Sequence, residues 1–152
     1  CPCGYQGHPT RGCRCTPEQI QRYRNRLSGP LLDRIDLCIE VPALSSADLS
    51  QAAPGESSAA VRERVAAAAS IALRRQGSIN ARLEGKDLDT HAKPDTAGQT
   101  LLNQAVNRLG LSARAYHRLL RVARTIADLA SAEHITAAHI GEAIQFRQLF
   151  SN

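Results

Sequence analysis

Residues 26–41 carry the feature that most constrains the fold, because a Gly-Pro turn leads directly into a strand-like segment. Apolar and polar residues alternate at 36–41, the pattern of a strand with one buried face, and Pro42 ends it. A lone strand leaves its backbone N–H and C=O groups unpaired, so we expect its partners in another part of a longer protein. The absence of Met and a first residue Cys1 lead to the same expectation.

The rest of the chain favours helices. Aromatic residues make up 3% of the sequence, so the core must be built from Ala, Leu, Ile and Val. This composition suits closely packed helices better than a sheet sandwich. We therefore expect a mainly α fold with one strand and a cysteine-rich loop. Helices are predicted at 16–27, 31–34, 58–76, 96–109, 112–130 and from 136 onward, with an ambiguous region at 78–94 that includes a short helix near 80–83.

Specific signals mark several helix ends. Thr16 and Gln19 have the spacing of a capping box, and Gly110 is placed to end the helix at 96–109. Ile135 and Ile140 flank the last helix start as a hydrophobic staple. The helix at 58–76 is rich in Ala, and one side of it carries Val61, Val65, Ala68, Ala69 and Ala72. Near the C-terminus we expect Ile144 and Phe146 or Phe150 to pack inward.

The N-terminal loop contains four of the five cysteines, in the pattern Cys1-x-Cys3 and Cys13-x-Cys15. Four thiolates satisfy a zinc ion, and a small loop without a core gains its folding energy from such a metal. A catalytic zinc is disfavoured because four thiolates leave no open coordination position. His8 is an alternative to one thiolate, and disulfides or unpaired thiols are alternatives to the metal.

Two arginines stand at the junctions of elements. Arg34 lies between Asp33 and Asp36, where either a plain salt bridge or a contact with a phosphate of a neighbouring subunit is consistent with the sequence. Arg114 lies in the first turn of a helix, where the macrodipole disfavours cations, so an anion close by is indicated. The arginines that follow on this helix are interpreted as a solvated face: Arg118, Arg121 and Arg124.

The segments CPCGYQGHPTRGCRCTPEQIQRYRNRLSGPLLDRIDLCIEVP and LGLSARAYHRLLRVARTIADL resemble the magnesium-chelatase-like AAA+ ATPases of the bacterial ComM type. The resemblance implies that residues 1–41 end an AAA+ core, 42–57 form a linker, and 58–152 form the helical lid domain. It implies that Arg34 is the catalytic arginine finger and Arg114 the nucleotide-binding sensor-2 arginine. It also implies a hexameric ring that uses ATP and Mg, with Cys1, Cys3, Cys13 and Cys15 available for a structural Zn.

The function implied is the C-terminal part of an ATPase motor acting on DNA, of the branch-migration or helicase type. The net charge of +5 permits a DNA partner without showing one. The alternatives are a chelatase-type motor acting on a protein partner, and a zinc-stabilised DNA-binding module. The segment has no G-x-x-x-x-G-K-[ST] motif, so we expect it to be inactive alone. No apolar run is long enough to span a membrane, and we expect a cytoplasmic location.

Overall fold

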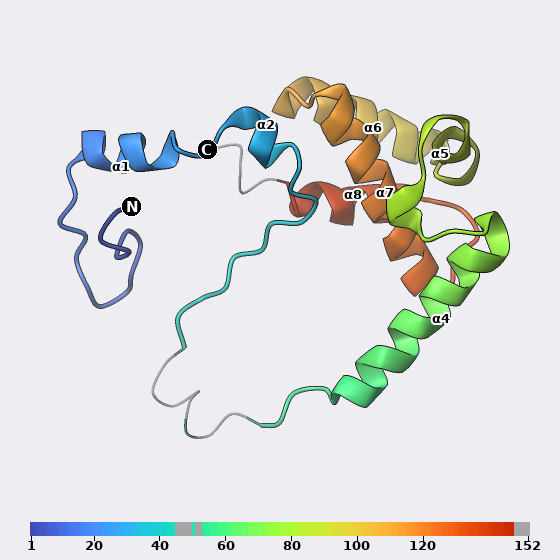
Figure 1. Cartoon of the computed structure of the whole chain (residues 1–152), viewed down its shortest axis with the longest axis horizontal. Helices are drawn as coiled ribbons and strands as arrows, with labels where there is room; N and C mark the ends of the chain where they lie inside the picture. The colour runs from blue at the N-terminus through green and yellow to red at the C-terminus, as the bar shows by residue number, and fades with distance from the viewer. Residues whose placement is uncertain (45–49, 51–52, 148–152) are drawn as a thin grey trace. The chain divides into compact units, whose positions relative to one another are not determined.

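The computed structural model describes residues 1–44, 50 and 53–147, and this part of the chain is mainly helical, as predicted. Part of the expected linker and the alternative core residue Phe150 lie outside the described residues. The elements are α1 (Pro17–Arg24), α2 (Gly29–Leu32), α4 (Ser58–Gln76), the 3-10 turn η1 (Asn80–Arg82), α5 (Gly85–His91), α6 (Thr96–Leu109), α7 (Ala113–Leu129) and α8 (Ala137–Gln145), labelled in Figure 1.

The chain divides into two compact units. The first comprises Cys1–Ile35 with Val41–Ala52, and the second comprises Asp36–Glu40 with Ala53–Asn152. The first unit carries the cysteine loop, α1 and α2, and its described residues are mostly exposed. The short segment Asp36–Glu40 therefore belongs with the helical bundle, although the residues on either side of it do not.

The core lies in the second unit and is aliphatic, as the composition predicted. Helix α7 is central, since it packs against α4, α5, η1 and α8, while α6 packs against α8. Burying side chains of this kind stabilises a domain by roughly 1.5–3 kcal/mol each. The large side chains that are almost completely buried here are Leu83, Leu88, Leu102, Leu119, Ile135 and Ile140.

The predicted helix ends are confirmed where a local cap defines them. Thr16 Oγ1 accepts the N–H of Gln19 at 3.3 Å, and the Gln19 side chain accepts the N–H of Thr16 at 3.0 Å, which completes the capping box. Gly110 has φ 59°, and the N–H of Leu111 reaches the carbonyl of Val106 at 3.1 Å, as in a Schellman cap. Both staple residues before and within α8 are fully buried.

Helices α1 and α2 differ in extent from the prediction. Helix α1 ends at Arg24 rather than at residue 27, with Asn25 as its C-cap, and the short turn at α2 begins before the predicted 31–34. The ambiguous region at 78–94 holds the expected turn near residue 80 and also α5, which the sequence did not single out. Ser28 explains the early start of α2, because its side chain caps the turn by accepting the N–H of Leu31.

The strand predicted at 36–41 is wrong for this structure. Its residues are not in a strand, and in the described part of the chain the β-pairing is an isolated parallel bridge between Pro94 and Ile135. The N–H of Cys38 donates to the carbonyl of Phe146 at 2.9 Å, which is one contact with a helix end rather than a ladder. Alternating side chains set the faces of a strand, but a strand exists only where a second backbone pairs with it.

The apolar side of α4 is buried over only part of its length. Ala68 and Ala72 are buried, whereas Val61 and Val65 are 37% and 54% exposed, so only part of this side is buried. In Figure 1 the N-terminal part of α4, in green, extends beyond the helices that it packs against. Periodicity identified the apolar side of the helix, and only the packing decides how much of that side meets a neighbour.

Candidate functional site

The four loop cysteines converge on one point of the first unit. Their Sγ atoms all lie within 4.8 Å of one another. The separation is 3.5 Å for Cys1 to Cys3, 3.5 Å for Cys3 to Cys13, and 3.7 Å for Cys1 to Cys13. Four sulfurs at about 2.3 Å from a tetrahedral zinc are about 3.8 Å apart, so these thiols fit a four-thiolate metal site.

Glycines and backbone hydrogen bonds shape this loop. Gly4 and Gly7 adopt φ values of 80° and 78°, a region that side chains disfavour, and the N–H of Gly4 closes a turn onto the carbonyl of Cys1 at 3.1 Å. His8 is not one of the converging residues, and its Nδ1 accepts the backbone N–H groups of Thr10 and Arg11 at 3.2 and 3.1 Å. The donor set is therefore four sulfurs.

The loop also shifts the pKa values of Cys3 and Cys13 in opposite directions. The backbone N–H of Tyr5, followed by that of Arg14, lowers the pKa of Cys3 from 9.0 to about 6. Cys13 behaves in the opposite way: the backbone N–H of Cys15 lowers its pKa, but burial and the neighbouring Cys3 and Cys15 sulfurs raise it overall. Metal ions bind thiolates, so a thiolate that is already present at neutral pH favours metal capture.

Arg34 follows a capped turn in the first unit. Ser28 caps α2, Pro30 lies in its first turn, and the N–H of Arg34 donates to the carbonyl of Leu31 at 3.0 Å. The residue is exposed. The backbone before Arg34 is thus held by local hydrogen bonds while its guanidinium side chain is at the surface.

Arg114 lies in the second unit and is also exposed, in the first turn of α7. Ser112 caps this helix by accepting the N–H of Ala115 at 3.2 Å. A capped N-terminus leaves other backbone N–H groups and the positive end of the macrodipole facing outward, beside a cationic side chain. The local charge there favours an anion, whereas Arg34 belongs to the other unit.

The remaining arginines of α7 do not form the solvated face that we expected. Arg118 pairs with Asp36 at 2.5 Å, and Arg121 donates to the carbonyl of Leu83 at 2.8 Å. Arg124 is only 2% exposed. Each step of three residues turns a helix by about 300°, so successive members rotate by about 60° toward the core. The interpretation was wrong because identical residue types at this spacing do not share one environment.

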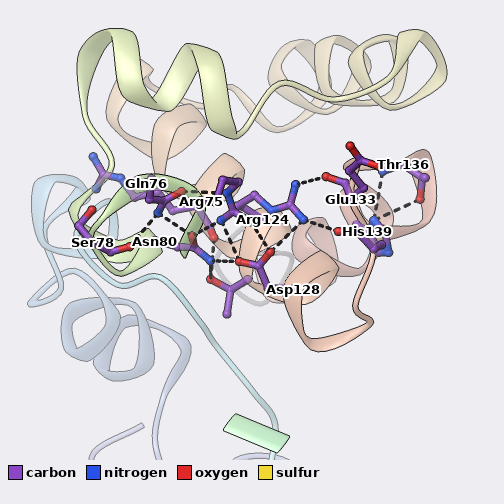
Figure 2. Close-up of polar contacts among 12 residues, drawn as sticks. Arg75, Gln76, Ser78, Asn80, Arg124, Asp128, Glu133, Thr136 and His139 are labelled. Atoms are coloured by element: carbon purple, nitrogen blue, oxygen red, sulfur yellow. Dashed lines mark hydrogen bonds and ion pairs between the residues drawn. The ribbon is translucent and has the colours of Figure 1, made fainter. Parts of the chain in front are cut away.

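Asp128 is the centre of a buried polar network that sequence reasoning missed (Figure 2). Its carboxylate accepts two bonds from Arg75 at 2.6 and 3.0 Å, and one from the Asn80 amide at 2.7 Å. Arg124 approaches it at 3.0 Å and also donates to the carbonyls of Ala132 and Glu133. The network joins α4, η1 and α7. The one signal in the sequence was the Arg124–Asp128 spacing of four residues on a helix.

The network keeps Asp128 ionised. Burial by itself raises the pKa of this carboxyl, but the hydrogen bonds from Arg75 and Asn80 and the charges of both arginines outweigh burial and lower it. Burial lowers the pKa of Arg124, although the Asp128 charge opposes this effect. A carboxylate held charged between two guanidinium groups is an arrangement that stabilises the packing of the helices.

A helical bundle preceded by a cysteine loop and an exposed arginine defines the class of protein. Residues 55–147 match the family described as "Magnesium chelatase, subunit ChlI C-terminal", and residues 1–49 match "Magnesium chelatase, subunit ChlI". The chain belongs to this magnesium-chelatase-like family of AAA+ proteins, and its helical bundle corresponds to the C-terminal domain.

Individual relatives are similar over nearly the whole chain. The chain is 47% identical over 137 residues to "Competence protein ComM" of Haemophilus influenzae, which covers 90% of this chain and 27% of that protein. It is 48% identical over 146 residues to YifB of Salmonella typhimurium, covering 95% and 28% of the two chains. It is 38% identical over 151 residues to Rv2897c of Mycobacterium tuberculosis, covering 97% and 30%. The chain thus spans less than a third of the length of these relatives.

No helix within the described residues is both long and apolar enough to cross a membrane.

Proposed function

We propose that this chain is part of a hexameric AAA+ ATPase that acts on DNA in a branch-migration or helicase reaction. The observation that carries the proposal is the 47% identity to a protein named "Competence protein ComM" across 90% of the chain. The cytoplasm, where ATP and DNA are both present in bacteria, is the proposed location. The net charge of +5 is compatible with a polyanionic partner.

In this proposal Arg34 is the arginine finger donated to the nucleotide of the neighbouring subunit. Its exposure, together with the capped turn before it, supports the role, because a finger must extend from a held backbone into another subunit's site. A guanidinium in that position neutralises charge that develops on the γ-phosphate during transfer. ATP with Mg supplies the phosphoryl chemistry, while the chain provides the stabilising charge.

Arg114 is proposed as the sensor-2 residue, which contacts the nucleotide bound to its own subunit. Its support is its exposed position beside the capped N-terminus of α7, where backbone N–H groups and the side chain both favour an anion. Helix α7 packs against α4, α5, η1 and α8, so Arg114 lies on the helix with the most neighbours in the bundle.

Cys1, Cys3, Cys13 and Cys15 are proposed to hold a structural zinc ion. The support is the convergence of four sulfurs at distances that suit tetrahedral coordination. A four-thiolate site is closed to substrate, so the metal would stabilise the loop rather than react. The described loop has few buried residues, which agrees with a fold that depends on a metal.

A second candidate is a chelatase-type motor that uses the same ATPase to act on a protein partner. The description of the matching family as magnesium chelatase favours it. The two candidates share Arg34 and Arg114 and differ only in what the motor moves.

The test is ATP hydrolysis by the complete protein, with and without branched DNA, for the unmodified protein and for Arg34→Ala. Loss of an arginine finger lowers turnover by about 10³–10⁵-fold, and we expect ATP binding to be retained. Arg22→Ala removes another exposed arginine from the first unit and is the matched control. Turnover stimulated by DNA supports the DNA motor, and indifference to DNA supports the protein-partner motor. Normal turnover of Arg34→Ala would exclude the finger assignment.

A further inference from the structure

The segment Asp36–Glu40 is attached to the helical bundle at two points, although the residues just before it belong to the other unit. Asp36 Oδ1 lies 2.5 Å from a guanidinium nitrogen of Arg118 on α7. The N–H of Cys38 donates to the carbonyl of Phe146, at the end of α8, at 2.9 Å. Together these contacts hold the segment against two helices of the lid.

The partner of Asp36 is unexpected from its neighbours in the sequence. Arg34 is only two residues away and was a natural candidate for a local salt bridge, yet the Asp36 carboxylate pairs with Arg118, 82 residues further along the chain. Asp36 and Leu37 also form one wall of a cleft of about 430 Å³ whose other walls include Val122 and Ile126 of α7. The ion pair therefore holds the Asp36 side chain at the surface of α7.

Each of the two paired residues lies close in the sequence to one of the two arginines of the proposed function. Asp36 follows Arg34 by two residues, so chain connectivity keeps their Cα atoms within about 7 Å. Arg118 follows Arg114 by four residues, which places it one turn further along α7, on the same side of the helix. One ion pair thus links the residues next to Arg34 with α7, the helix that carries Arg114.

We propose that Asp36 and Arg118 form a positioning pair, which ties the arginine-finger segment to the lid helix so that movement of the lid at Arg114 is transmitted to Arg34. The inference rests on the proposed function, since it assigns no chemistry to the pair itself. In a ring, this link would connect nucleotide sensing in one subunit to the finger that the same subunit offers to its neighbour.

Because the pair is exposed, its positioning role can be tested separately from any contribution to folding stability. The Arg118 side chain is 24% exposed and that of Asp36 is 50% exposed, and pairs so accessible to water contribute little to folding stability. Removing one partner should therefore leave the fold intact, whereas a displacement of about 1 Å at a reacting group lowers turnover by up to about 100-fold.

The experiment measures kcat, KM for ATP and Tm in the complete protein for Asp36→Asn, Arg118→Gln and the exchanged pair Asp36→Arg with Arg118→Asp. We expect each single variant to lower kcat by about 10- to 100-fold, with KM and Tm close to those of the unmodified protein. The exchanged pair should recover part of the lost kcat, because it restores opposite charges at the same two positions.

Arg64→Gln is the matched control, since Arg64 pairs with Glu56 at the same 2.5 Å on an exposed part of α4 and should leave kcat unchanged. Unchanged kcat in both single variants, or a loss of kcat that tracks a loss of Tm, would overturn the positioning role. Arg34→Ala, measured alongside, distinguishes a failure of the positioning pair from a failure of the proposed function. If Arg34→Ala abolishes turnover while Asp36→Asn leaves kcat unchanged, only the positioning role of the pair is refuted. If Arg34→Ala leaves turnover unchanged, the proposed function is refuted, and the inference that rests on it is refuted with it.

Discussion

Replacing Asp128 with Asn tests whether the buried network holds α4 on the bundle. Asp128 is 1% exposed and accepts bonds from Arg75, Asn80 and Arg124, so its loss of charge leaves two guanidinium groups without a counter-charge. Breaking a buried pair by neutralising one partner costs about 3–5 kcal/mol. Asn keeps the side-chain size and one acceptor oxygen, so we expect a loss of about 3 kcal/mol, at the lower end of that range.

The assay is thermal and urea unfolding followed by far-UV circular dichroism. For a domain of this size a loss of about 3 kcal/mol lowers Tm on the order of 10–25 °C. Arg75→Gln should cost less, about 1.5 kcal/mol, because Asp128 keeps Arg124 and the Arg75 side chain is partly open to water. Asp89→Asn, at an exposed position of α5, should remain within about 0.5 kcal/mol of the unmodified protein.

The order of these effects is the decisive result. If Asp128→Asn costs less than about 1 kcal/mol, the pair behaves like a surface salt bridge and the network does not hold the helices together. If Arg75→Gln lowers the free energy of unfolding as much as Asp128→Asn does, Arg124 by itself does not stabilise the Asp128 carboxylate. That result would refute the role assigned to Arg124 in the network.

Two further predictions concern acid and metal. Because the folded-state pKa of Asp128 is lowered, its contribution to stability is fully present above the unfolded value of about 3.9 and is lost as the pH falls through the lower folded value. Urea unfolding between pH 6 and pH 2 should show this loss, and Asp128→Asn should lack that component of the acid dependence. Second, the purified protein should bind one zinc per chain by metal analysis. Cys3→Ser should lose it, while Cys38→Ser, outside the converging thiols, should retain it. Zinc retained by Cys3→Ser would contradict the four-thiolate site.

The sequence alone was sufficient wherever the deciding interaction is local. The capping box at Thr16, the left-handed Gly110 and the capped start of α7 each depend on hydrogen bonds between residues five or fewer positions apart. Cysteine spacing also identified the thiols that converge, since a short glycine-containing loop has few ways to arrange them. The roles of Arg34 and Arg114 stay predictions that rest on the family resemblance and await the kinetic tests.

Tertiary structure decided what depends on partners distant in the sequence. Alternation at 36–41 described a strand, but the segment meets α7 and the end of α8 instead of another strand. Arg118 and Arg124 look alike in the sequence, yet one pairs near the surface and the other is buried beside Asp128. Asp128 draws its ligands from Arg75 and Asn80, 53 and 48 residues away. The energy of such contacts depends on burial and on a complete set of partners, and both exist only once the helices have packed.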